Sequence, residues 1–339
     1  MGTNDKQKES GISRFIHGAN FRSYSGVILI ILILGALLAI FTPGHTFLSA
    51  NNILNILRQI AVYGVLSVGM AFVMIGAGID LSVGATAGFC GALTCILVTN
   101  GVMGFLPALI IGVIVGTLIG LLLGVIITAT KIPPFVATLA GMTSIRGFAY
   151  IICDGKPIGN LPENMLNFGT KRILGIPILI LVMLLVFVVG GIILSKTSFG
   201  RSVYAVGGNA TAARLAGINI NRVWVMTYAI SGFCAGLGGI MLACRNASAQ
   251  PTAGNTFETE AIAGCAMGGV AFTGGSGTAT GVFFGVFLMG IINNGMNLLG
   301  INSYWQLVVK GIIIVVAVVY SMHANETSTK PKKSKKAEA

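Results

Sequence analysis

The sequence predicts an all-α polytopic membrane protein with about ten transmembrane helices, some of them broken by glycine-rich or re-entrant segments. Three observations support this fold class. The chain of 339 residues is 55% hydrophobic and only 9% charged, whereas an average soluble domain is about a quarter charged. Its apolar runs reach the roughly 18 residues that a helix needs to cross the hydrocarbon core. Its 48 glycines cluster in these runs, where small residues let membrane helices pack closely.

The expected transmembrane region covers residues 25–321, with a polar segment (1–24) before it and a basic tail (322–339) after it. The approximate spans are 25–42, 54–76, 81–99, 105–129, 134–153, 176–195, 223–244, 259–273, 277–299 and 303–321. The first run is too long for the apolar part of a signal peptide, and its polar leader is not a compact charged region. We therefore expect it to remain as the first helix.

The distribution of Lys and Arg predicts the orientation, because cytoplasmic segments of membrane proteins carry an excess of these residues. With both termini in the cytoplasm, the external segments hold only four of the 21 Lys and Arg residues, namely Lys156, Lys171, Arg172 and Arg245. The formal net charge of +12 therefore requires no nucleic acid, and the tail is expected to anchor the topology and to contact anionic lipid.

Three basic residues lie inside predicted spans: Arg58, Arg146 and Lys310. A charge that faces lipid at mid-depth costs about 2.5–3.5 kcal/mol on insertion scales. We therefore predict that Arg146 and Lys310 face protein or water. The alternative is that their side chains reach toward the head groups.

The sequence contains no pattern typical of a metal site or an enzyme. The six cysteines lie within or at the ends of apolar spans without a C-x-x-C pair, as small buried hydrophobic residues do. The three histidines are far apart and outside the spans, and the spans contain no Ser/His/Asp set. We therefore expect a protein that is not an enzyme and has no metal of its own.

Glycines occur in two distinct patterns. In "GVIVGTLIGLLLG" (112–124) they recur every four residues on one helix face, which is typical of close helix packing. In "GGVAFTGGSGTATG" (268–281) the spacing of Gly269 and Gly274 resembles a phosphate-binding loop. Gly275 stands where that loop requires a lysine. We therefore predict that these glycines bend and pack helices and bind no nucleotide.

A second interruption, "GAGIDLSVG" (76–84), contains Asp80. Asp80 is expected to cap the third helix by accepting the N–H of Ser82 or Val83. Alternatively, Asp80 and Ser82 line a translocation path, since ionisable groups in membrane segments are usually functional. A proton relay is disfavoured because we find no second carboxylate within the spans.

Three amides and a glutamine lie near the end of the chain. Asn293, Asn294 and Asn297 have the spacing of one helical face, and amides in lipid must be paired or wet. They either bond neighbouring helices or line the outer half of a path together with Gln306, where they would offer donors and acceptors to a polar solute.

The longest cytoplasmic connection inside the bundle, at 196–222, contains "NATAARLAGI". Asn209 is a good N-cap, the following residues favour a helix, and Gly217 can end it. Such a short helix offers a surface to a soluble partner. The alternative is a linker that lies on lipid.

Six motifs follow one another in order: "GIDLSVG" (78–84), "PPFVATLAGM...RG" (133–147), "GRSVYAVGGNATAARLAGI" (200–218), "SAQPTAG" (248–254), "EAIAGCAMGGVAFTGGSG" (260–277) and "NNGMNLLGINSYWQLVVKG" (293–311). With this series the chain resembles, from about 30 to 320, the ribose-type permeases of bacterial ABC sugar importers. The resemblance implies a multi-pass protein of the bacterial inner membrane that works as a dimer of permease subunits. It also implies two cytoplasmic ATPase domains that bind the ATP, and an external binding protein that delivers a monosaccharide.

Carried onto this chain, the resemblance implies that the segment at 209–218 docks on the ATPase, with Asn209, Ala213, Arg214 and Gly217 as coupling residues. It further implies that the binding protein docks near Gln250, Pro251 and Thr252. Ala77 replaces a glycine that is usual in the family. The alternative function is an ion-coupled secondary sugar transporter, which would need coupling charges at mid-membrane. Ribose-, galactose-, allose-, xylose- and furanose-type permeases share most of the pattern, so the sugar itself is left open.

Overall fold

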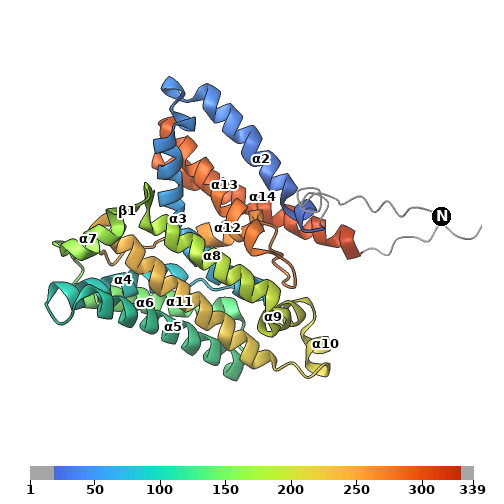
Figure 1. The fold of residues 1–339 in the computed structure, drawn as a ribbon. Helices are drawn as coiled ribbons and strands as arrows, with labels where there is room; N and C mark the ends of the chain where they lie inside the picture. The colour runs from blue at the N-terminus through green and yellow to red at the C-terminus, as the bar shows by residue number, and fades with distance from the viewer. Residues whose placement is uncertain (1–18, 330–339) are drawn as a thin grey trace, which may run out of the picture.

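The computed structural model describes residues 19–329, so most of the segment 1–24 and the lysines of the tail lie outside the described residues. Each of the ten predicted apolar segments contains a helix, which confirms the all-α prediction (Figure 1). In chain order the elements are α2 (Ala19–Phe41), the 3-10 helix η1 (Pro43–Leu48), α3 (Ala50–Ile75), α4 (Val83–Thr99), α5 (Phe105–Thr130), α6 (Pro134–Cys153), α7 (Glu163–Thr170), β1 (Arg172–Ile173), β2 (Ile176–Pro177), α8 (Ile178–Lys196), α9 (Ser198–Gly208), α10 (Ala210–Leu215), α11 (Ile220–Asn246), α12 (Phe257–Met267), α13 (Ala279–Leu298) and α14 (Ser303–Thr329).

The helices differ in their ability to cross a membrane. Among the described residues, six helices are long and apolar enough to do so: α3, α5, α6, α8, α11 and α13. The eighth predicted span, 259–273, needs correction, because α12 has only 11 residues. At 1.5 Å per residue it is about 16 Å long, roughly half the hydrocarbon thickness. α12 is therefore a half-helix with irregular chain on both sides.

α3 and α11 form the centre of the bundle. Every residue from Ile60 to Ile75 of α3 is buried. α11 packs against α5 through small residues on both helices. A Cβ added to Gly116 would lie 2.6 Å from the carbonyl oxygen of Gly232, which is closer than real contacts allow. The four glycines spaced along α5 are all buried, so their predicted packing role is confirmed.

The chain between α3 and α4 forms the first break, residues 76–82. Ala77 has a φ of +61°, a left-handed conformation in which a residue with a Cβ is strained by roughly 1–2 kcal/mol. This explains why a glycine would be natural at this position. The break stays buried at Gly76, Gly78, Asp80 and Ser82, so its polar groups need partners within the protein.

The chain between α12 and α13 forms the second break, residues 268–278. Gly274 and Gly275 have φ values of +84° and +74°, and Gly274 lies against Ala77 of the first break. The N–H of Gly275 donates to the carbonyl of Ile75 at 2.8 Å. The prediction that these glycines bend and pack helices is thus confirmed.

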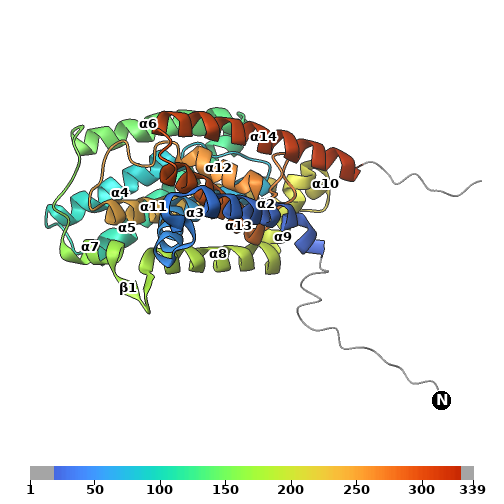
Figure 2. The same ribbon diagram turned by 90° about the horizontal axis from the view of Figure 1, so that it is seen from above.

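The two ends of the bundle carry different elements. α9 and α10 lie at the same end as the start of α2 and the end of α14, whereas α7 and the β1–β2 hairpin lie at the other end (Figure 1). At that second end, Ile158 and Ala249 pair in an isolated antiparallel bridge. Seen from above, α6 and α14 follow one edge of the bundle and α8 the opposite edge (Figure 2).

Candidate functional site

The predicted cytoplasmic helix exists as α10. The side chain of Asn209 accepts the N–H of Ala212 at 2.9 Å, and Gly217 follows the helix with a φ of +82°. The cap and the helix end are therefore confirmed. The preceding helix α9 has a similar cap, since Thr197 accepts the N–H of Gly200 at 3.0 Å. α9, α10 and the turn to α11 are called the coupling segment (198–219) below.

Exposure changes the set of residues that a partner could touch. Arg214 and Gly217 are exposed, but Ala213 is only 4% exposed, so a partner surface cannot reach its side chain. Leu215, which sequence reasoning missed, is 86% exposed. The available signal was a leucine in an otherwise small and polar segment. A shallow pocket of about 430 Å³ lies beside it, lined by Arg214, Gly217, Ile218, Asn219, Ile220 and Asn221.

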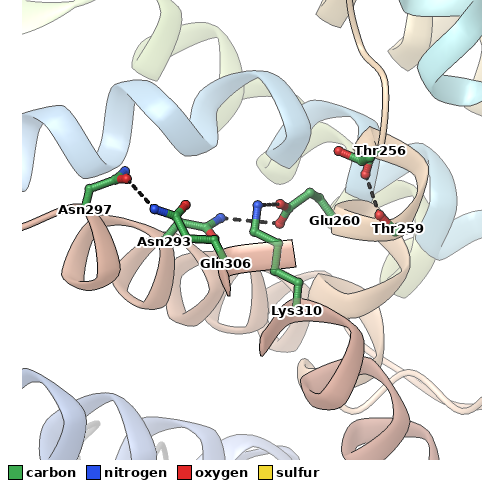
Figure 3. Close-up of polar contacts among 7 residues, drawn as sticks. All are labelled: Thr256, Thr259, Glu260, Asn293, Asn297, Gln306 and Lys310. Atoms are coloured by element: carbon green, nitrogen blue, oxygen red, sulfur yellow. Dashed lines mark hydrogen bonds and ion pairs between the residues drawn. The ribbon is translucent and has the colours of Figure 1, made fainter. Parts of the chain in front are cut away.

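A second polar site lies where α12, α13 and α14 meet (Figure 3). Lys310 Nζ forms an ion pair with Glu260 Oε1 at 2.5 Å, and the two side chains are 24% and 6% exposed. Asn293 Nδ2 donates to the other carboxylate oxygen at 3.5 Å. Next to this group, Gln306 Nε2 donates to Asn297 Oδ1 at 2.8 Å. These five residues are called the polar cluster.

Glu260 contradicts one expectation from the sequence. We found no second carboxylate within the spans, yet Glu260 is buried in the first turn of the half-helix α12. The available signal was an acidic residue inside a predicted apolar span. Its partner Lys310 is 50 positions away, so only the fold joins them.

The basic residues inside spans have protein partners. Arg146 Nη1 donates to the carbonyls of Pro251 and Ala253 at 2.8 and 2.6 Å, and Lys310 pairs with Glu260. The prediction that Arg146 and Lys310 face protein or water is confirmed. Arg146 thereby holds the loop that leads into α12. In that loop Gln250 and Thr252 are exposed, and Pro251 is buried.

The three asparagines of α13 do not share one face. Asn293 and Asn297 belong to the polar cluster, whereas Asn294 is buried and exchanges two hydrogen bonds with Asn52 of α3, at 3.0 and 2.9 Å. Consecutive helical residues point about 100° apart, which separates Asn294 from Asn293. In this conformation Asn294 has the packing role that the sequence left open.

Asp80 and Ser82 lie inside the protein, 1% and 2% exposed. Asp80 Oδ1 accepts the backbone N–H of Ser82 at 2.9 Å, as the cap hypothesis predicts, and also the Ser82 hydroxyl at 2.6 Å. Ser231 of α11 donates to Asp80 Oδ2 at 2.7 Å. The carboxylate of Asp80 therefore connects the first break to α11 through hydrogen bonds.

The cysteine prediction is confirmed, since all six cysteines are buried and free. Within residues 19–329, no group of three or more His, Cys, Asp and Glu side chains could hold a metal ion.

A bundle of long apolar helices, with a largely buried ion pair among its helices and an exposed capped helix at one end, is typical of a multi-pass membrane protein. Residues 52–318 match the family described as "Branched-chain amino acid transport system / permease component". The chain belongs to this permease family, which is a family of transport-system components rather than of secondary transporters, and it is a multi-pass protein of a bacterial inner membrane.

Curated relatives support this membership. The chain is 46% identical over 306 residues to the ribose import permease protein RbsC of Bacillus subtilis, covering 90% of this chain and 94% of that protein. It is 42% identical over 302 residues to RbsC of Haemophilus influenzae, covering 87% and 91%. It is 36% identical over 293 residues to the D-allose transport system permease protein AlsC of Escherichia coli, covering 86% and 90%. No solved structure matches the chain.

Proposed function

We propose that this chain is the membrane subunit of an ATP-binding cassette importer that translocates a monosaccharide, ribose or a related sugar. The relatives named as ribose import permeases support the substrate class. The observation that carries the mechanism is the coupling segment, a capped helix that presents Leu215 and Arg214 at the end of the bundle where α2 begins and α14 ends. A soluble ATPase docked there would bind the ATP, so the permease itself needs no cofactor.

The proposed ATPase contact predicts the effect of Leu215→Asp. We expect the variant to bind the ATPase subunit about tenfold more weakly, because a charge replaces an apolar anchor in a contact that excludes water. Co-purification of the ATPase from membranes, titrated with purified ATPase, measures this. Leu174→Asp is the matched control, since Leu174 is also exposed, at 98%, but lies in the hairpin at the opposite end. Equal binding by both variants would disprove the docking site.

A second copy of the chain is the proposed neighbour of α6 and α14. α6 is mostly exposed yet much less apolar than α8, the exposed helix at the opposite edge. Its exposed residues include Thr143, Ser144 and Gly147. α14 exposes Tyr304, Trp305 and Ile312, and none of its residues whose burial is described is buried, so little of it packs within one chain. A lipid-facing helix has no need of hydroxyl groups, whereas a helix interface favours small and polar residues.

Cross-linking tests this homodimer. Ile151 of α6 is 73% exposed, and Leu185 of α8 is 62% exposed. With all native cysteines buried, we expect Ile151→Cys to form covalent dimers with a bifunctional maleimide, and Leu185→Cys to stay monomeric. Dimers through Leu185→Cys alone would place the interface on the other edge.

The polar cluster is the proposed lining of the translocation path on this face. Asn293, Asn297 and Gln306 supply amide donors and acceptors that suit sugar hydroxyl groups. The Oδ1 atom of Asn293 is buried and has no hydrogen-bond partner among the described residues. No direct contact with the sugar is proposed for Asp80, Ser82 and Asn294, because their polar groups are already hydrogen-bonded within the protein. Their proposed role is to support the helices behind the lining. Alternating access would then expose the cluster first to the binding protein, docked at Gln250 and Thr252 beside Pro251, and later to the cytoplasm.

A further inference from the structure

In both breaks, side chains donate hydrogen bonds to backbone carbonyls. These carbonyls need such donors because the end of a helix leaves its last C=O groups without partners in the helix. In the first break, Tyr228 Oη donates to the carbonyl of Ile79 at 3.1 Å, and Trp224 Nε1 donates to that of Gly76 at 3.0 Å. Both side chains belong to the first turns of α11, directly after the coupling segment.

The second break is contacted by α9, the first helix of the coupling segment. Tyr204 of α9 donates its hydroxyl to the carbonyl of Gly277 at 2.7 Å. On the same helix, Gly207 lies so close to the carbonyl of Ile75 that no Cβ would fit between them. The coupling segment thus contacts the end of α3 and the start of α13 through its own α9.

Each break is joined to a helix that belongs to the proposed translocation path or packs beside it, namely α12 for the second break and α4 for the first. The second break follows the half-helix α12, which carries Glu260 and thereby the contact with Lys310 of α14. The first break leads into α4, whose Gly84 and Gly88 pack against the loop around Gly254 and Ala253. A shift of α9 and of the first turns of α11 would therefore act directly on both breaks, through the hydrogen bonds of Tyr204, Trp224 and Tyr228.

We propose that Tyr204 and Tyr228 are positioning residues that transmit movement of the coupling segment to the two breaks, and through them to α4 and α12. This proposal rests on the proposed function. Both tyrosines hold irregular backbone rather than another helix face, and an irregular segment can change its dihedral angles more easily than a hydrogen-bonded helix. The hydroxyl groups are the required part, and the rings fill space.

Tyr204→Phe and Tyr228→Phe test this role, because each keeps the ring and removes one hydrogen bond. In proteoliposomes with the ATPase subunit and a ribose-binding protein, we expect each variant to import about two- to tenfold less ribose per ATP hydrolysed, the range that one hydrogen bond supports. Binding of the ATPase and thermal unfolding should stay close to those of the unchanged chain. Ser202→Ala is the control on α9, since within the described part of the chain the Ser202 hydroxyl donates only to the carbonyl of Ser198 in the same helix.

A second readout separates transmission from mere packing. In a chain that carries only Asn297→Cys, labelling of this cysteine by a water-soluble maleimide should depend on the bound nucleotide. When Tyr204→Phe and Tyr228→Phe are added to Asn297→Cys, the labelling should become independent of nucleotide. An unchanged ratio of ribose to ATP would overturn the proposal, as would a loss of activity that follows a loss of thermal stability. Failure of the unchanged chain to bind the ATPase or to import ribose would instead refute the proposed function.

Discussion

Replacing Lys310 with methionine is expected to destabilise the protein by about 3–5 kcal/mol, because removal of one partner leaves the other charge of a buried pair uncompensated. The Glu260 side chain is only 6% exposed in the unchanged chain, and without Lys310 its remaining neighbour would be the neutral amide of Asn293 at 3.5 Å. Thermal and denaturant unfolding in detergent micelles measure the loss.

Two control variants make the Lys310 result specific. Lys156→Met removes the other ion pair found in the described residues, between side chains that are 79% and 89% exposed, and should change little. Replacing both Glu260 and Lys310 with methionine should restore most of the stability, since no buried charge then lacks a partner. Equal stability of Lys310→Met and Lys156→Met would show that the pair is solvated in the membrane.

Replacing Gly232 with alanine is expected to prevent correct assembly of the bundle. A Cβ at this position would overlap the carbonyl of Gly116 and lie 2.9 Å from the nitrogen of Gly120, so the backbones of α5 and α11 would have to separate. Backbone atoms cannot move aside as a flexible side chain can, and tightly packed interiors tolerate added volume poorly. We expect little folded protein in the membrane, measured as the monodisperse fraction after detergent extraction.

The matched control is Gly26→Ala in α2, where nothing lies within 4 Å of an added Cβ. Alanine should stabilise that helix by roughly 0.5–1 kcal/mol. Normal amounts of monodisperse protein with Gly232→Ala would mean that α5 and α11 pack less closely than the structure shows.

Contacts made by the chain on both sides of the half-helix α12 explain why this short helix is tolerated in a membrane protein. A helix of 11 residues exposes free N–H and C=O groups at membrane depth, which must be buried in protein or meet water. Here the loop before α12 is held by Arg146, and the second break after it by Tyr204. α12 is therefore fixed at both ends by side chains from other helices.

Local features of the chain were predictable from the sequence. The ten apolar segments, the glycine face of α5 and the cap of α10 by Asn209 each depend on residues within one helix or its nearest neighbours. Hydrophobic transfer into lipid, close packing of small residues and end-capping act over such short ranges. For the same reason the bend at Gly274 and Gly275 could be predicted, but not the element against which it packs.

By itself, the sequence determined that this chain is a helical membrane protein, where its helices and glycine breaks fall, and which segment is the coupling candidate. The tertiary structure decided that Lys310 meets Glu260, that Asn294 turns away from Asn293 toward Asn52, and that Leu215 rather than Ala213 is exposed. It also decided that α12 stops halfway. These outcomes depend on which helices become neighbours and at what rotation, and that choice comes from packing between residues far apart in the chain, on which local periodicity has no influence.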